Sequence, residues 1–130
     1  MVSFLLTGAS AQGPTMKQLM LDLIHPASND ILLFVNRGAP NTEPEWAAVR
    51  HSALILAESG NVLVSPDRAR DQSDWAKDAK LLADAGAAAY RAAQTKDLKA
   101  LASLTDSLDA ACTTCHRQFR PNVFPREGSK

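Results

Sequence analysis

Apolar residues recur every three or four positions along most of this chain, which is the spacing of one face of an α-helix. Four segments carry the pattern, at residues 15–37, 42–63, 73–93 and 97–119. The apolar positions of the first are Met16, Leu19, Met20, Leu23, Ala27, Ile31 and Phe34. Pro26 lies inside this segment and cannot donate the helical hydrogen bond to the carbonyl of Asp22, so we expect a kink near His25.

Helix-start and helix-stop residues bound the other three segments. Thr42, with Glu45 three residues later, has the pattern of a capping box. Ser73 and Asp97 precede the third and fourth segments as N-caps, and Pro121 ends the fourth. The third and fourth segments are therefore predicted as one continuous helix each.

Two glycines modify this pattern. Gly60 lowers the helix propensity of the second segment and is a point at which that helix could end early. Gly86 lies among alanines in the third segment, and such small side chains let a neighbouring helix approach closely. Four amphipathic helices with short connections predict an all-α fold, an antiparallel four-helix bundle.

Composition and charge support one domain and exclude some partners. A chain of 130 residues with 45% hydrophobic content is long enough to bury one core. Fourteen basic and fourteen acidic side chains give zero net charge, so nothing global attracts nucleic acid or an anionic membrane. No segment approaches the roughly 18 to 20 apolar residues that span a bilayer.

The N-terminus resembles the end of an export signal. A short apolar run at residues 2–6 leads to Ala9-Ser10-Ala11, an A-x-A cleavage pattern, although no basic residue precedes the run. We expect residues 1–11 to be a cleaved signal remnant and residues 12–130 to form the single mature domain. Export to the bacterial periplasm follows from this interpretation.

The pentapeptide Cys112-Thr113-Thr114-Cys115-His116 is the candidate functional motif. Residues i, i+3 and i+4 share one face of a helix, so the two thiols and the imidazole point the same way. Cys-x-x-Cys-His is the arrangement that attaches c-type haem. The thiols then form thioethers to the porphyrin, and His116 is the proximal ligand of the iron.

Other interpretations of Cys-x-x-Cys fit less well. A structural zinc site needs four Cys or His ligands at recognisable spacing, whereas His25 and His51 lie far from the motif and from each other. A thioredoxin-like dithiol belongs to a βαβ setting, and no segment here has convincing strand periodicity. A disulfide between residues three apart on a helix would join no distant parts. A helical thiol or metal protein without haem stays as the third hypothesis.

At its C-terminal motif the chain resembles the class II cytochromes c, the cytochrome c′ group. The nine residues 112–120, CTTCHRQFR, are similar to that family's Cys-x-x-Cys-His-x-x-Tyr/Phe-Arg ending. The resemblance implies an exported four-helix bundle with one covalent haem c between the last and first helices, and antiparallel homodimers as one assembly. It also implies that Arg120 lies close to the haem, although a cation in the last turn is favoured by the helix dipole alone.

The sixth position of the iron distinguishes two functions within this resemblance. Met20 matches the distal ligand of the six-coordinate members. Met16, one turn earlier, stands where many members of the family carry an arginine that contacts a haem propionate. Lys17 is therefore the alternative residue for that contact. Apolar helix faces also use methionine simply as core filler. His25 is predicted to lie off the apolar stripe of the first helix, and His51 off that of the second, so each is a weaker ligand candidate.

These observations predict a one-electron carrier, not an enzyme, because Met ligation opposite His raises the potential and closes the iron to small ligands. The alternative is a five-coordinate, cytochrome c′-like protein that binds nitric oxide or carbon monoxide. The redox partner is an unidentified protein. The basic end, with Arg117, Arg120, Arg126 and Lys130, is a candidate docking patch for an acidic partner.

Overall fold

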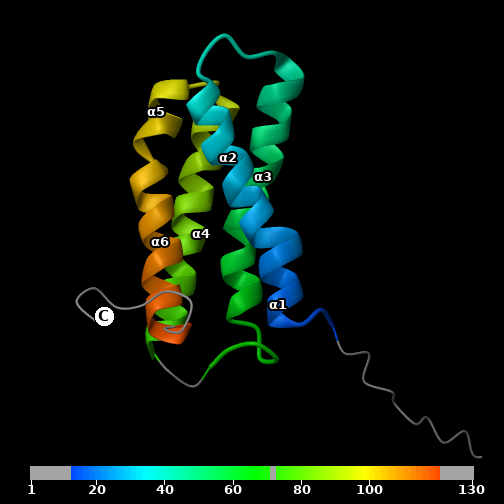
Figure 1. The fold of residues 1–130 in the computed structure, drawn as a ribbon, viewed down its shortest axis with the longest axis vertical. Coiled ribbons are helices and arrows are strands. Elements are labelled where there is room, and N and C mark those ends of the chain that lie inside the picture. Colours follow the sequence, from blue (N-terminus) through cyan, green and yellow to red (C-terminus); the bar gives the residue numbers. More distant parts are fainter. Residues whose placement is uncertain (1–12, 71–72, 121–130) are drawn as a thin grey trace, which may run out of the picture.

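A computed structural model describes residues 13–70 and 73–120 (Figure 1). In these residues every regular element is helical, and the elements are α1 (Met16–Leu19), the π turn η1 (Met20–Ile24), α2 (His25–Arg37), α3 (Glu43–Leu63), α4 (Ser73–Gln94), α5 (Leu98–Ser103) and α6 (Thr105–Phe119). None of these helices is long and apolar enough to cross a membrane. The predicted signal remnant, residues 1–11, lies outside the described part of the chain.

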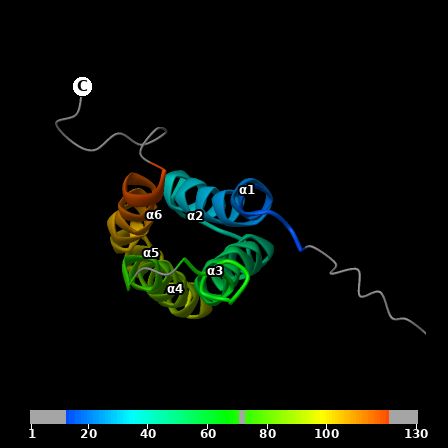
Figure 2. The ribbon, with the colours of Figure 1, turned by 90° about the horizontal axis from the view of Figure 1, so that it is seen from below.

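The elements stand as four columns arranged around a common centre (Figure 2). The first column is α1, η1 and α2, the second is α3, the third is α4, and the fourth is α5 with α6; successive columns run in opposite directions (Figure 1). The second column packs on the first and third, and α6 packs on α4. The all-helical bundle predicted from the sequence is confirmed.

A π turn occupies the place of the kink predicted in the first column. The N–H of His25 donates to the carbonyl of Met20, five residues back, directly before Pro26. Because a π turn takes up one extra residue, it shifts the faces that follow it. The prediction for Leu23 is therefore wrong, since Leu23 is 37% exposed and Ile24, 4% exposed, takes its place in the core.

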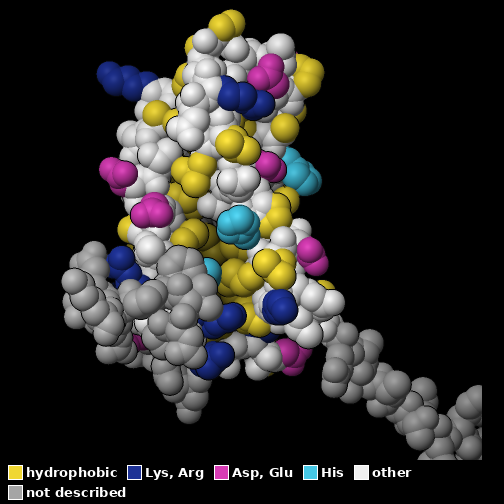
Figure 3. Space-filling model, viewed as in Figure 1, with side chains coloured by type: hydrophobic (Ala, Val, Ile, Leu, Met, Phe, Trp, Pro, Cys, Tyr) yellow, Lys and Arg dark blue, Asp and Glu magenta, His cyan; other side chains and the backbone are white. Residues whose placement is uncertain are grey.

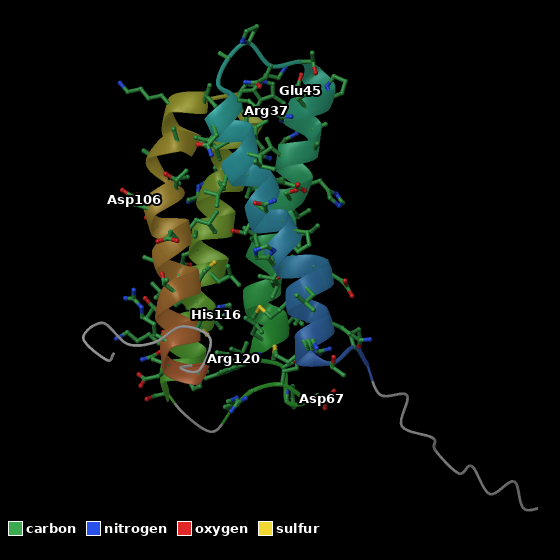
Figure 4. All side chains as sticks on the ribbon, viewed as in Figure 1. Arg37, Glu45, Asp67, Asp106, His116 and Arg120 are labelled. Carbon is green, nitrogen blue, oxygen red and sulfur yellow. The ribbon has the colours of Figure 1, made fainter. Side chains whose placement is uncertain are left out.

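The predicted helix starts are confirmed where the structure records a cap. Thr42 accepts a hydrogen bond from the N–H of Glu45 at 3.3 Å, and the Glu45 carboxylate accepts one from the N–H of Thr42 at 3.2 Å. Asp97 accepts from the N–H of Ala100 at 2.9 Å. Arg37, at the end of α2, lies 3.9 Å from the Glu45 carboxylate, so this ion pair bridges the α2–α3 connection (Figure 4).

The second and third columns approach closely at two glycines, of which the small-residue pattern predicted Gly86. A Cβ added to Gly86 would lie 2.3 Å from the backbone nitrogen of Ala57, and one added to Gly60 would lie 2.6 Å from the carbonyl oxygen of Ala79. Gly60 does not end α3, which continues to Leu63. Packing against α4 offsets its low helix propensity.

The fourth column is interrupted, contrary to the prediction of one helix. Leu104, with φ −90° and ψ −6°, separates α5 from α6. Two hydroxyls bond backbone carbonyls at this point: Ser103 donates to Ala100 at 2.6 Å, and Thr105 donates to Ala102 at 2.9 Å. Side chains of this type compete with the helical hydrogen bonds. Both α5 and α6 pack on α4, and α5 also contacts α2.

The core is filled at the end of the bundle where α2 meets α5. Phe34 and Trp46 pack edge to face with ring centroids 4.7 Å apart, and Phe34, Ile31, Leu56 and Leu101 are almost fully buried. The opposite end, formed by α1, η1 and α6, is different because it contains a cleft.

Candidate cofactor site

An apolar cleft lies between the first column and α6, with α4 contributing to its floor. It has two parts, of about 220 and 360 Å³. Both parts are lined by Met20, His25, Cys115 and His116, so they form one continuous site. Figure 3 shows the hollow, with hydrophobic side chains inside it and basic side chains along its lower edge. Small-molecule sites in proteins occupy roughly 300–1,000 Å³, and this cleft is of that size.

Helix α6 presents the Cys-x-x-Cys-His motif to this cleft. Cys112, Cys115 and His116 are each half-buried and line its inner part. Both cysteines are free thiols. His116 and Arg120 lie at the lower end of α6 on the side toward the first column (Figure 4), and Arg120 lines only the outer part of the cleft. The structure thus brings together the residues that the spacing placed on one helix face.

The first column faces the motif with Met20 and His25. Met20 lines both parts of the cleft, as the candidate distal residue should, whereas Met16 lines only the outer part. His25 is exposed, as expected for a residue off the apolar stripe, yet it also lines both parts of the cleft, beside the π turn. His51 lies elsewhere, in a shallow depression between α3 and the first column.

Burial keeps the two thiols protonated. Desolvation raises the pKa of Cys112, and the Ser28 hydroxyl beside it partly offsets the effect. The pKa of Cys115 rises to about 11, first because of burial and then because of the negative charge of Asp78. Redox-active dithiols have lowered thiol pKa values, because the thiolate is the reactive form. The site is therefore unlike that of a thiol–disulfide exchange protein.

The pKa of His116 shifts in the opposite direction. Its pKa is lowered, first by burial and then by the positive charges of Arg120 and His25. A lowered pKa favours the neutral imidazole at neutral pH. Neutral imidazole is the form that binds a metal ion.

Two further residues of the cleft were not identified from the sequence. Asp78, on α4, is only 3% exposed and lines the inner part. Its position three residues after Trp75, on the apolar face of the third segment, was the available signal. No sequence pattern indicated that Arg70, in the loop before α4, would line the cleft. It lies over the rings of Trp75 and Phe119, at 5.4 and 5.8 Å from their centroids, and lines the outer part of the cleft.

The donor set and the surroundings fit a covalently attached haem. Two thiols stand one turn apart with an imidazole beside the second, the inner cleft is apolar, and the cations Lys17, Arg70 and Arg120 line its outer part. Among the described residues, no three His, Cys, Asp or Glu side chains gather as an ordinary protein metal site would need. A haem iron takes its equatorial ligands from the porphyrin and needs only axial ligands from the protein.

Comparison of the chain with protein-family models, with curated proteins and with solved structures found no match. The geometry of the chain itself is therefore the basis for assigning a function. It defines a helical bundle with a thiol–thiol–imidazole motif facing an apolar cleft, and a methionine and a second imidazole on the opposite wall.

Proposed function

We propose that this protein is an exported monohaem c-type cytochrome that carries one electron at a time between redox proteins. The observation that carries the proposal is the placement of Cys112, Cys115 and His116 together in the inner part of an apolar cleft. A Cys-x-x-Cys-His sequence on a helix can face either the core or the solvent. Here all three side chains line the inner part of the cleft together with Met20.

Covalent attachment in this proposal uses the two thiols. Cys112 and Cys115 would hold the haem as thioethers, each formed by addition of its S–H across one vinyl group, with the sulfur on one vinyl carbon and the thiol proton on the other. The addition needs no external oxidant or reductant. Such attachment takes place outside the bacterial cytoplasm, which agrees with a periplasmic protein.

Two residues on opposite walls of the cleft would hold the haem iron in this proposal. His116 on α6 would offer an imidazole nitrogen, and Met20 in η1 would offer a thioether sulfur. The bound haem would supply an iron that alternates between its ferric and ferrous states. Lys17, Arg70 and Arg120, in the outer part of the cleft, would face the propionate carboxylates.

Electron exchange with a partner protein would take place at the outer part of the cleft. Arg120 lines this opening, so an acidic partner would be attracted to it. Arg117 lies on α6, three residues before Arg120, which directly follows the helix, whereas Arg126 and Lys130 of the candidate docking patch lie outside the described residues. The protein is proposed as a carrier, with no substrate converted.

Absorption spectra of the exported protein, made with haem-maturation proteins present, test the function. We expect low-spin bands in both oxidation states, the weak long-wavelength band of methionine bound to ferric iron, and no change with carbon monoxide. High-spin bands that shift with carbon monoxide would instead assign the protein to the gas-binding cytochromes c′. A colourless protein with free thiols or stoichiometric zinc would overturn both assignments.

Haem retention after denaturation tests the covalent attachment. We expect wild-type protein to keep its haem on a denaturing gel and the Cys112→Ala/Cys115→Ala variant to lose it. Thr114→Ala is the matched control, since Thr114 lies between the two cysteines but is exposed. Haem that stays with the double variant would refute the thioether assignment.

A further inference from the structure

The π turn places His25, whose side chain is exposed, one turn after Met20 on the wall opposite the haem motif. In a regular α-helix, at 100° per residue, a residue five positions on lies about 140° around the axis. In η1 the N–H of His25 bonds the carbonyl of Met20, so the two residues stand on consecutive turns. Both side chains line the inner and the outer parts of the cleft, together with His116.

Pro26 is a local reason for this arrangement. It has no N–H to offer the carbonyl of Asp22, so an α-helical hydrogen bond is missing at this point whichever helix type forms. The free-energy cost of forming a π turn is therefore lower here than in an uninterrupted helix. Pro26 thus favours the turn after which His25 follows Met20 in the lining of the cleft, and His25 carries an imidazole, the commonest side-chain ligand of protein-bound metals.

We propose that His25 is a reserve ligand for the iron, which takes the sixth position when the Met20 thioether is removed. The proposal rests on the proposed function, because it needs an iron between His116 and η1. It has a consequence that the sequence pattern does not suggest. Removing Met20 gives a closed iron with two imidazoles, not an open, gas-binding iron.

The test uses four holoproteins: wild type and the variants Met20→Ala, Met20→Ala/His25→Gln and Met20→Ala/His51→Gln. We expect Met20→Ala to lose the long-wavelength methionine band, stay low-spin, have a lower reduction potential and bind carbon monoxide no faster than wild type. The added His25→Gln change should give high-spin iron that binds carbon monoxide rapidly. His51→Gln is the control, because His51 lies outside the cleft and should change nothing.

Two results would overturn the proposal. One is a Met20→Ala protein that is already high-spin and binds carbon monoxide as rapidly as the His25 double variant. The other is a Met20→Ala/His25→Gln protein that stays low-spin, which would assign the ligand to a different residue such as Met16. If Met20→Ala does not fold, as judged by its helical circular dichroism, Met20→Leu replaces it, since it conserves side-chain volume and cannot ligate.

Failure of this inference is distinguishable from failure of the proposed function. If wild-type protein carries no covalent haem, both fail. If all four proteins carry one covalent haem and only the spin state of Met20→Ala differs from expectation, then the cytochrome assignment stands and the role of His25 is refuted.

Discussion

Replacement of Gly86 by alanine tests the close packing of α3 on α4. The added Cβ would lie 2.3 Å from the nitrogen of Ala57, 2.7 Å from the carbonyl carbon of Leu56 and 2.9 Å from the Cα of Ala57. Carbon atoms in favourable contact are about 3.5–4.0 Å apart, so the helices would have to separate by roughly an ångström. All three atoms belong to the backbone, and no side-chain rotation can relieve the overlap.

The magnitude follows from two opposing terms. Overpacking of a well-packed core costs about 1–3 kcal/mol, and a backbone overlap belongs at the upper end of that range. Alanine regains about 1 kcal/mol over glycine in helix propensity. We therefore expect Gly86→Ala to lower the free energy of unfolding by about 2 kcal/mol. For a domain of this size, that loss corresponds to a fall in Tm of about 8 °C.

Urea unfolding followed by circular dichroism measures this effect on wild type and variant in parallel. Ala76→Gly is the control, because Ala76 is exposed in the same helix and reports propensity without a packing change. It should lose at most about 1 kcal/mol. A Gly86→Ala protein as stable as wild type, or more stable, would show that α3 and α4 do not approach as closely as the structure has them.

Two further substitutions test the floor of the cleft. The buried indole N–H of Trp75 donates to the carbonyl of Leu63 at 2.7 Å. Trp75→Phe leaves that carbonyl unpaired and should lower the free energy of unfolding, measured in urea, by about 1–3 kcal/mol. Trp46→Phe is the control and should cost less, because the described residues supply no acceptor for its indole. Equal losses in the two variants would contradict a role for the hydrogen bond. Burial raises the pKa of Asp78, so its contribution to stability is greatest at low pH and is lost as pH rises from the unfolded-state value through the folded-state pKa. We expect Asp78→Asn to gain stability relative to wild type between pH 4 and pH 7, and a difference in Tm that does not change with pH would refute this.

Local sequence alone determined the starts of two helices and the shape of the motif. Capping by Thr42 and Asp97 involves residues only three positions away, so it could be predicted without knowledge of the fold. The same holds for Cys112, Cys115 and His116, because the rise and twist of one helix place them on one face. That all three face a cleft was a prediction that depended on the apolar stripe of the same helix.

The tertiary structure decided which residues stand opposite the motif. Near Pro26 the helical hydrogen bond to the carbonyl of Asp22 is missing, and the π turn that forms there buries Ile24. Periodicity, which assumes one twist throughout, placed Leu23 in the core and His25 off the apolar stripe, and it did not predict that His25 lines the cleft. Arg70 and Asp78 reach the site from the α3–α4 connection and α4 because those columns pack together through Gly86. Contacts within one helix turn follow from the local sequence. The residues that line a site from other helices depend instead on which surfaces, distant in the sequence, are buried against each other.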